Sequence, residues 1–248
     1  MARIIALANQ KGGVGKTTST INLGAALAEA GQRVLLVDVD PQASLTDALG
    51  IDASALPQSI YDVLTGRLAL EAILRPVGPL TVAPATIDLA AAEMQLISEF
   101  GREQLLGDAL APIASRFDQI LIDCPPSLGI LTINALTAAD EVLVPVECHY
   151  MALRGLTQLM QSIEKIQRRT NGRLALLGIL PTMYDNRTVH ENEVLSTLQT
   201  RFPGKVFTPV RRSIRFAETA VAGQPMLSYD AAHPGADAYR ALATEVLR

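Results

Sequence analysis

The sequence predicts a single doubly wound α/β domain, in which a mostly parallel β-sheet carries helices on both faces. Two observations lead to this fold class. Seven short apolar runs alternate with longer stretches of helical spacing, and such alternation is typical of right-handed βαβ crossovers. The runs are apolar at nearly every position, which indicates strands buried on both faces of a parallel sheet.

The expected elements follow in chain order. Each strand is placed where β-rich apolar residues are continuous, at 3–9, 33–38, 80–85, 117–123, 141–147, 174–180 and 205–210. Each helix is placed where apolar residues recur at helical spacing, at 16–30, 88–97, 102–115, 128–137, 151–169, 188–201 and 235–247. Residues 50–78 are expected to form short helices over one end of the sheet. No repeat or linker breaks this order, so we expect residues 1–248 to form one domain.

The composition excludes several classes of protein. Every apolar run is interrupted well before the roughly 20 residues that a membrane-spanning helix needs, and residues 2–8 are too short for a signal peptide, so we expect a cytoplasmic protein. Cys124 and Cys148 lie far apart and the three histidines are scattered, which argues against a disulfide framework or a zinc site. The net charge is −4, so any contact with nucleic acid must come from a local basic patch.

Residues 9–18, which read NQKGGVGKTT, follow the first strand and open the first helix. Glycines allow successive backbone N–H groups to point at an anion, and the helix N-terminus adds partial positive charge. Lys16 can then reach the β- and γ-phosphates of a nucleotide, and the Thr17 hydroxyl can bind Mg²⁺. The alternative is a glycine-rich turn with chance lysines. The usual phosphate-loop pattern fails in one place, because Gln10 occupies its first glycine position, and a second lysine, Lys11, follows.

These residues resemble a known family. The stretch KGGVGKTT is similar to the deviant Walker A box of the ParA/MinD group of ATPases, and the stretches at 37–44 and 120–127 resemble the group's two other nucleotide motifs. The resemblance covers nearly the whole chain and is strongest to the short partition ATPases called ParA or Soj. It implies ATP and Mg²⁺ as cofactors. The residues expected to hold the nucleotide in this loop are Lys11, Gly12, Gly13, Val14, Gly15, Lys16, Thr17 and Thr18.

The extra lysine, Lys11, has a role in this family, where the corresponding residue reaches across to the ATP of a second subunit. The resemblance therefore implies a homodimer with ATP. Electrostatics agree with it, because one ATP already has Lys16 and Mg²⁺, whereas a lysine supplied by a partner would act as an arginine finger does in trans. The alternative is a solvated lysine without a partner.

Carboxylates follow two of the predicted strands. Asp38 and Asp40 stand two residues apart, so both side chains can project toward the crevice at the strand's carboxyl end. The resemblance implies that Asp40 positions the attacking water and is catalytic together with Lys11 and Lys16. It also implies that Asp38 lies close to the metal's water shell and that Asp123, the Walker B residue, holds Mg²⁺ through water. For Asp38 the alternative is a strand-end cap.

Two features near these motifs are less specific. Cys124 is interpreted as a small apolar filler rather than a nucleophile, and the two prolines after it are expected to stiffen the start of a switch loop that ends at Gly129. Family members hold the adenine base with loops that follow later strands. The resemblance therefore places Met183 and Pro209, in the segments 183–186 and 209–211, near the base.

Nine of the 21 Lys and Arg residues lie in the segments 165–173 and 201–215, which contain no acidic residue. If the segments meet in the fold, they can neutralise DNA phosphates without reading bases; the alternative is a pair of solvated faces. The resemblance implies nonspecific DNA binding by Arg187 and Arg215, and the neighbouring Arg211 and Arg212 fit this role. The segments 210–213 and 218–225 depart from the family pattern, which leaves the shape of this loop open.

The function implied is an ATP-switched, nucleoid-associated dimer that segregates a chromosome or plasmid, with a ParB-type partner that stimulates slow hydrolysis. A MinD-like division ATPase is the alternative; it needs an amphipathic C-terminal membrane anchor, and the final stretch ADAYRALATEVLR resembles the last core helix instead, so we expect no membrane association. A metabolic enzyme of the same fold is a second rival. Because the nucleotide motif begins within ten residues of the start, we expect no N-terminal helix-turn-helix extension.

Overall fold

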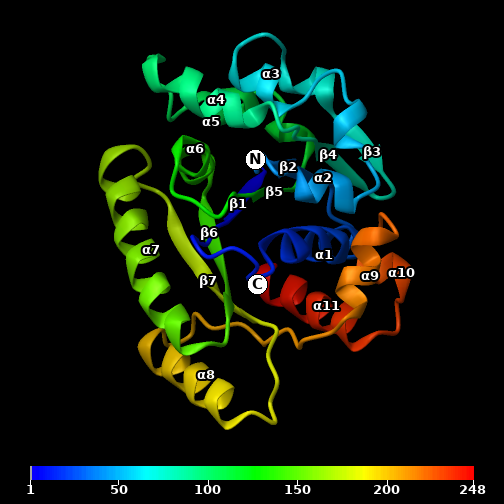
Figure 1. The fold of residues 1–248 in the computed structure, drawn as a ribbon, viewed down its shortest axis with the longest axis vertical. Coiled ribbons are helices and arrows are strands. Elements are labelled where there is room, and N and C mark those ends of the chain that lie inside the picture. Colours follow the sequence, from blue (N-terminus) through cyan, green and yellow to red (C-terminus); the bar gives the residue numbers. More distant parts are fainter. Residues whose placement is uncertain (1) are drawn as a thin grey trace.

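A seven-stranded sheet forms the centre of the computed structural model, which describes residues 2–248 (Figure 1). The strands lie in the order β3-β4-β2-β5-β1-β6-β7, and all neighbouring pairs are parallel except β3 with β4. Their bounds are β1 Arg3–Leu7, β2 Val34–Asp38, β3 Arg75–Val77, β4 Leu80–Ala83, β5 Gln119–Asp123, β6 Glu141–Glu147 and β7 Ala175–Thr182.

Helices cover both faces of this sheet. Their bounds are α1 Lys16–Glu29, α2 Ser44–Ala48, α3 Ile60–Leu64, α4 Leu89–Gln95, α5 Leu105–Leu110, α6 Ile130–Ala138, α7 Tyr150–Arg169, α8 Val189–Arg201, α9 Arg215–Val221, α10 Met226–Tyr229 and α11 Pro234–Val246. Short 3₁₀ helices occupy Ala53–Ala55, Leu70–Ile73, Leu96–Ser98 and Ala114–Arg116. Among residues 2–248, no helix is both long and apolar enough to cross a membrane.

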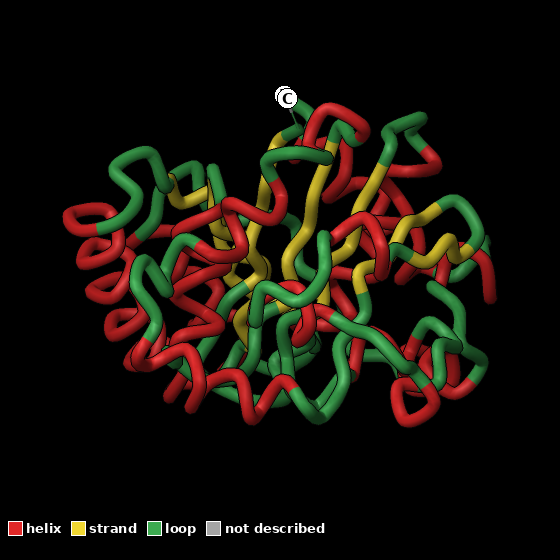
Figure 2. Tube along the Cα trace, turned by 90° about the horizontal axis from the view of Figure 1, so that it is seen from above, coloured by secondary structure: helices red, strands yellow, loops and turns green. Residues whose placement is uncertain are grey.

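The core is divided into two apolar layers by the sheet. One layer packs α3 to α8 on one face, and the other packs α1 and α11 on the opposite face, so the strands lie between helices in the view from above (Figure 2). Every residue of β2 and β5 is buried. This is the doubly wound arrangement that the continuous apolar runs predict, and the predicted fold class is confirmed.

Two predictions about the sheet are wrong. The run at 205–210 is not a strand: it is hydrogen-bonded to β7 at Lys205, Phe207 and Val210, but these bonds form only the isolated bridge Ile179–Val206 and no continuous ladder. The seventh strand is instead β3, which lies in the segment where only short helices were expected and pairs antiparallel with β4 at the sheet edge. The other six predicted strands and all seven predicted helices correspond to observed elements.

Candidate nucleotide site

The turn between β1 and α1 is held in one conformation by its glycines and by a contact with β7. Gly13 and Gly15 have φ angles of 72° and 80°, a left-handed region that costs other residues more than glycine. Gly15 is the N-cap of α1, which begins at Lys16. The Thr182 hydroxyl donates to the Val14 carbonyl at 2.9 Å. The helix N-terminus therefore opens toward the carboxyl ends of the strands, where an anion is favoured.

A cleft of about 520 Å³ lies over this helix N-terminus. The residues expected to bind nucleotide that line the cleft are Gly12, Gly13, Gly15, Lys16, Thr17, Thr18 and Met183. Asp40 also lines it, and Lys11, Val14 and Pro209 do not. Lys16 is only 6% exposed, and burial lowers the pKa of its amine, an effect that the nearby Asp123 carboxylate opposes. The cleft thus holds a buried cation whose surroundings favour an anionic ligand.

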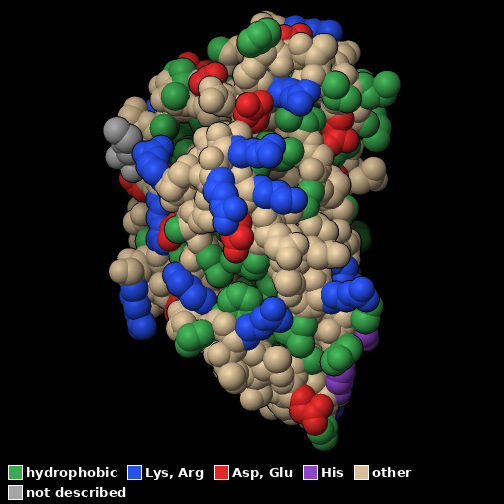
Figure 3. Space-filling model, turned by 90° about the vertical axis from the view of Figure 1, so that its left-hand side faces the viewer, with side chains coloured by type: hydrophobic (Ala, Val, Ile, Leu, Met, Phe, Trp, Pro, Cys, Tyr) green, Lys and Arg blue, Asp and Glu red, His purple; other side chains and the backbone are tan. Residues whose placement is uncertain are grey.

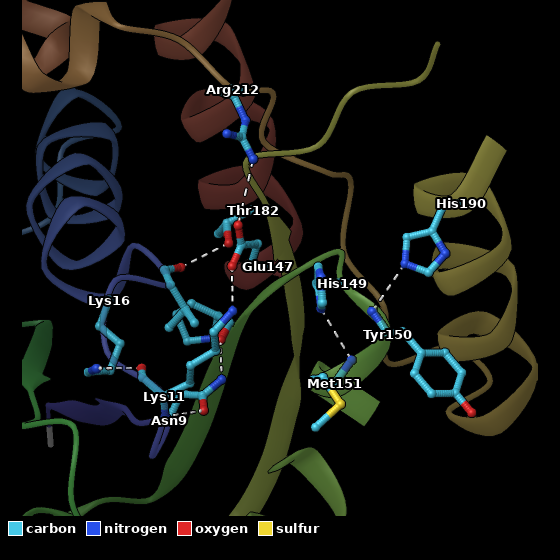
Figure 4. A network of polar contacts seen from close by, with 12 residues as sticks. Asn9, Lys11, Lys16, Glu147, His149, Tyr150, Met151, Thr182, His190 and Arg212 are labelled. Atoms are coloured by element: carbon cyan, nitrogen blue, oxygen red, sulfur yellow. Dashed lines mark hydrogen bonds and ion pairs between the residues drawn. The ribbon is translucent and has the colours of Figure 1, made fainter. Parts of the chain in front are cut away.

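Lys11 lies on the outer side of the same loop. Its side chain is 46% exposed, and its Nζ lies 2.5 Å from the Glu147 Oε2 (Figure 4). This hydrogen bond lowers the pKa of the Glu147 carboxyl. Arg212 approaches the other oxygen of Glu147, with its Nη2 3.6 Å from the Glu147 Oε1. The backbone N–H of Lys11 donates to the Asn9 Oδ1 at 3.0 Å. Lys11 is therefore fixed at its backbone and faces the surface at its tip.

The buried Asp123 carboxylate ends β5 beside the start of α1. Its Oδ2 accepts a hydrogen bond from the Thr17 hydroxyl at 2.7 Å, and its Oδ1 accepts one from Thr20 at 3.1 Å. Burial, and next the neighbouring Asp38, raise the pKa of the Asp123 carboxyl, so a cation here would restore its ionised form. Hydroxyl and carboxylate oxygens suit Mg²⁺, which completes its shell with water and phosphate. Thr17 and Asp123 therefore fit the metal role predicted for them.

The two aspartates after β2 occupy different environments. Asp40 is at the cleft wall, and its Oδ1 accepts the backbone N–H of Gln42 at 2.9 Å. Asp38 does not line the cleft: its Oδ1 accepts the Asp40 N–H at 3.1 Å, and its Oδ2 accepts the Thr46 N–H and hydroxyl at 3.0 and 2.8 Å. Asp38 thus fixes the segment that carries Asp40. Its predicted place beside the metal's water shell stays a prediction.

Two further predictions concern the adenine side and Cys124. Cys124 is fully buried, and burial raises the pKa of its thiol, which agrees with an apolar filler. Met183 adopts a left-handed φ of 52° at the cleft, whereas Pro209 lines a separate hollow of about 340 Å³ with Arg211 and Arg212. The predicted contact of Pro209 with the base stays a prediction, since the residues that follow it, Val210 and Arg211, line another hollow together with Gly15 and Met183.

Sequence reasoning missed one whole wall of the cleft. The missed lining residues on and after α9 are Phe216, Thr219, Ala220 and Gln224. The loop beyond α9 is tied back to α1, because the Asn22 Oδ1 accepts the Met226 N–H at 2.8 Å. Thr219, Ala220 and Gln224 lie in the segment 218–225, which departs from the family pattern, so their residue types gave no signal and only the position of the segment in the chain could have done so.

The predicted basic patch is spread along β7. Arg173 precedes this strand and Arg211 pairs with Tyr184 beyond its far end, and a strand of 8 residues spans roughly 25 Å. The second segment is not confined to that end, because the Lys205 carbonyl accepts the N–H of Ile179 in the middle of β7. Whether the two segments form one basic surface stays a prediction. Lys and Arg side chains are distributed over the face on which α7 lies (Figure 3).

The four arginines expected to bind DNA stand near the nucleotide end of β7. Three of them have carboxylate partners: Arg187 pairs with Asp185 at 2.7 Å, Arg215 with Glu218 at 2.8 Å, and Arg212 with Glu147. Arg211 lies close enough to Asp185 to help lower the pKa of that carboxyl. All four arginines are exposed. A polyanion would have to compete with surface ion pairs, which contribute little in water.

Comparison with known proteins relates this geometry to a family. Residues 2–176 match a family described as an AAA domain. The chromosome-partitioning ATPase Soj of Treponema pallidum is 46% identical over 250 residues, covering 100% of this chain and 98% of that protein. The chromosome partitioning protein ParA of Myxococcus xanthus is 44% identical over 251 residues, covering 100% of this chain and 89% of that protein.

Solved structures agree with these sequence matches. A Mycobacterium smegmatis protein described as cobyrinic acid a,c-diamide synthase, bound to an ATP analog and magnesium, has a TM-score of 0.89 and 45% identity over 100% of this chain and 95% of that one. The cell division ATPase MinD of Pyrococcus furiosus is more distant, with a TM-score of 0.82 and 27% identity over 100% and 99% of the two chains. Sequence, fold and cleft together show that the chain belongs to the ParA/Soj family of partition ATPases.

Proposed function

We propose that ATP drives two copies of this partition ATPase into a dimer that binds duplex DNA without reading its sequence, and that hydrolysis separates them. The observation that carries the proposal is the opposite orientation of the two loop lysines. Lys16 is buried at its own cleft, whereas Lys11 lies outside it and is exposed. A Lys11 side chain that leaves Glu147 finds a phosphate in the cleft of a second copy, where its charge stabilises phosphoryl transfer.

The residues of this chain then divide the work at each cleft. Lys16 and the backbone of residues 12–15 would hold the phosphates, and Thr17 and Asp123 would hold Mg²⁺, as the ATP analog and magnesium in the M. smegmatis structure support. Bound Mg²⁺ supplies positive charge that neutralises the phosphate oxygens. Asp40 would orient the attacking water, since its carboxylate lines the cleft and accepts a single backbone hydrogen bond, from Gln42.

DNA would contact Arg187, Arg211, Arg212 and Arg215. Each faces solvent and, where paired, holds only a surface partner. Such contacts release counterions, so the logarithm of affinity should fall with the logarithm of salt by about 0.9 for each neutralised phosphate. A ParB-type centromere-binding protein, the expected partner, would stimulate the slow turnover and release the dimer from the nucleoid.

The experiment is a salt series of DNA binding, measured by fluorescence anisotropy with a nonhydrolysable ATP analogue and with ADP. We expect tight, salt-sensitive binding with the analogue, much weaker binding with ADP, and a shallower salt slope for Arg215→Glu. Arg33→Glu is the matched control, because Arg33 is also exposed and paired with a carboxylate, Asp118, but at a distant site. Binding that ignores both salt and nucleotide would refute the DNA role.

Two other functions have a specific observation in their favour. The M. smegmatis neighbour is described as a cobyrinic acid a,c-diamide synthase. ATP turnover that rises with cobyrinic acid and ammonia, but not with DNA, and that yields the amide would make this chain an amide-forming enzyme. The MinD neighbour favours a membrane-associated division ATPase. That function requires ATP-dependent binding to anionic lipid vesicles, which we do not expect.

A further inference from the structure

A second groove, away from the nucleotide cleft, has an apolar floor. It has a volume of about 670 Å³ and lies between the 3₁₀ turn after α4, the first turn of α6 and the end of α7. Its floor consists of Ile97, Ile130, Ile133 and Ile166. Ile97 is 63% exposed. Four isoleucines from three separate segments thus form a hollow that water covers only at a cost in free energy.

The apolar surface continues along the chain beside this groove. Met94 is 78% exposed and Phe100 is fully exposed, and they lie three residues to either side of Ile97. Large side chains that cluster in this way on the surface mark contact sites for other proteins more often than isolated ones do. Three large apolar side chains within seven residues of the chain are thus exposed, and one of them, Ile97, lines the groove.

The rim of the groove is cationic. Arg102, Lys165 and Arg169 stand around the floor, against a single carboxylate, Glu103. Arg102 is held in place because its guanidinium donates to the Ile97 carbonyl. Lys165 and Arg169 form no ion pair with any residue between 2 and 248. In a chain whose net charge is −4, this local excess of positive charge favours an anionic ligand.

We propose that this groove, defined by Ile97, Ile130, Ile133, Ile166, Arg102, Lys165 and Arg169, is the docking site of an acidic amphipathic helix from a partner protein. Apolar side chains at helical spacing fill the floor, and glutamates or aspartates beside them pair with the rim. Duplex DNA would pair only with the cationic rim, because its charged backbone offers no apolar surface to the four isoleucines. The proposal is independent of the DNA-binding arginines, which lie at the other end of β7.

The groove is also connected to the nucleotide site. Ile130 and Ile133 stand on the first turn of α6, directly after the loop that begins at Asp123. The Thr132 hydroxyl donates to the Ser127 carbonyl at 2.7 Å, which ties this turn to that loop. A helix seated in the groove therefore contacts the element that follows the Walker B aspartate.

The test is a selection from a displayed library of helical peptides about four turns long, panned on the whole chain with ADP so that no ATP dimer forms. We expect the enriched peptides to be acidic, with apolar residues at i, i+3 or i+4, and i+7. Their affinity, measured by fluorescence anisotropy, should fall roughly tenfold or more in Ile97→Asp and in the double variant Lys165→Glu/Arg169→Glu. Ile214→Asp is the matched control, because Ile214 is 80% exposed and lies elsewhere.

Several results would overturn the proposal. The selection would overturn it by enriching no peptide, or by enriching basic or neutral peptides. Equal peptide affinity of the groove variants and the control variant would also overturn it, provided that thermal melting shows all of them to be folded. Loss of DNA binding but not of peptide binding in Lys165→Glu/Arg169→Glu would assign the rim to nucleic acid. A lower particle mass of Ile97→Asp than of the unaltered chain, both with ADP, would make a second copy the occupant.

Discussion

The two limbs of the phosphate loop differ in what their lysines face. Lys16 is buried at the start of α1 and lines the cleft, whereas Lys11, five residues earlier, is half exposed and bound to Glu147. A buried cation needs an anion in the same cavity. An exposed ion pair is worth little more than about 1 kcal/mol, so Lys11 can exchange Glu147 for a phosphate at small cost. The loop thus carries a fixed positive charge, Lys16, at its own nucleotide cleft and a movable positive charge, Lys11, on its outer side.

The largest effect should come from removal of the fixed charge. Lys16→Ala leaves the phosphates without their buried cation, and we expect nucleotide affinity to fall about a hundredfold, since hydrogen bonds to charged groups contribute roughly 1.5–3 kcal/mol each. Titration with a fluorescent ATP analogue measures this. If Lys11→Ala weakens binding to the isolated subunit as strongly as Lys16→Ala does, the division between the two lysines is wrong.

Asp40→Ala removes the carboxylate opposite the fixed lysine. We expect ATP binding to persist and turnover to fall by up to about a hundredfold, which is typical for loss of a group that positions the reacting water. Phosphate release under single-turnover conditions measures it. Asp47→Ala is the control, because Asp47 is an exposed residue of the same segment. A fall in affinity without a fall in rate would place Asp40 in binding instead.

Asn9→Ala tests how firmly the outer limb is anchored. The Asn9 side chain is buried, accepts from the Lys11 N–H, and donates to the Pro145 carbonyl at 2.7 Å. Its loss leaves a buried carbonyl without its donor, so the free energy of unfolding should fall by about 1–3 kcal/mol. Urea denaturation measures this, with Gln10→Ala as the neighbouring control. No change in the free energy of unfolding would mean that the Asn9 hydrogen bonds are not needed to hold the backbone at Lys11.

Glu147→Gln should have the smallest effect. It removes the ion pairs of Glu147 with Lys11 and Arg212, whose partners are both exposed, so we expect about 1 kcal/mol of stability or less to be lost. The pKa of Glu147 is lowered below 4.5 in the folded state, so its contribution is present above that pH and is lost as the pH falls through the lowered value. Denaturation curves of both proteins should therefore differ slightly at pH 7 and converge in acid. A larger gap at low pH would contradict this assignment.

The sequence predicted the sheet well where strands are long and fully apolar. It failed for β3, a three-residue edge strand that contains Pro76, because short edge strands have little apolar pattern. It also failed for 205–210, where an apolar run follows β7 without forming a ladder. The run does bond β7 through Lys205, Phe207 and Val210, but Pro209 has no N–H to donate, and the bonds do not extend into a continuous ladder.

The candidate site was predictable where phosphate or metal binding requires particular residue types. The glycines, Lys16, Thr17 and Asp123 lie together as expected. The contacts of Asp38 with Thr46 were not foreseeable, because the two residues meet only after the chain turns between them. The α9 wall of the cleft was missed for a similar reason: Phe216 and Thr219 reach the cleft through tertiary packing, and no local pattern reports that.

The central claim is that Lys11 acts on the nucleotide of a second copy. Light scattering tests it most directly on the unaltered chain and on Lys11→Ala, each with ADP and with a nonhydrolysable ATP analogue. We predict that the particle mass of the unaltered chain rises from 26.5 kDa to about twice that value with the analogue alone. Lys11→Ala should bind the analogue and stay monomeric. Equal masses of the unaltered chain with both nucleotides, or a Lys11→Ala dimer that forms normally, would contradict the claim.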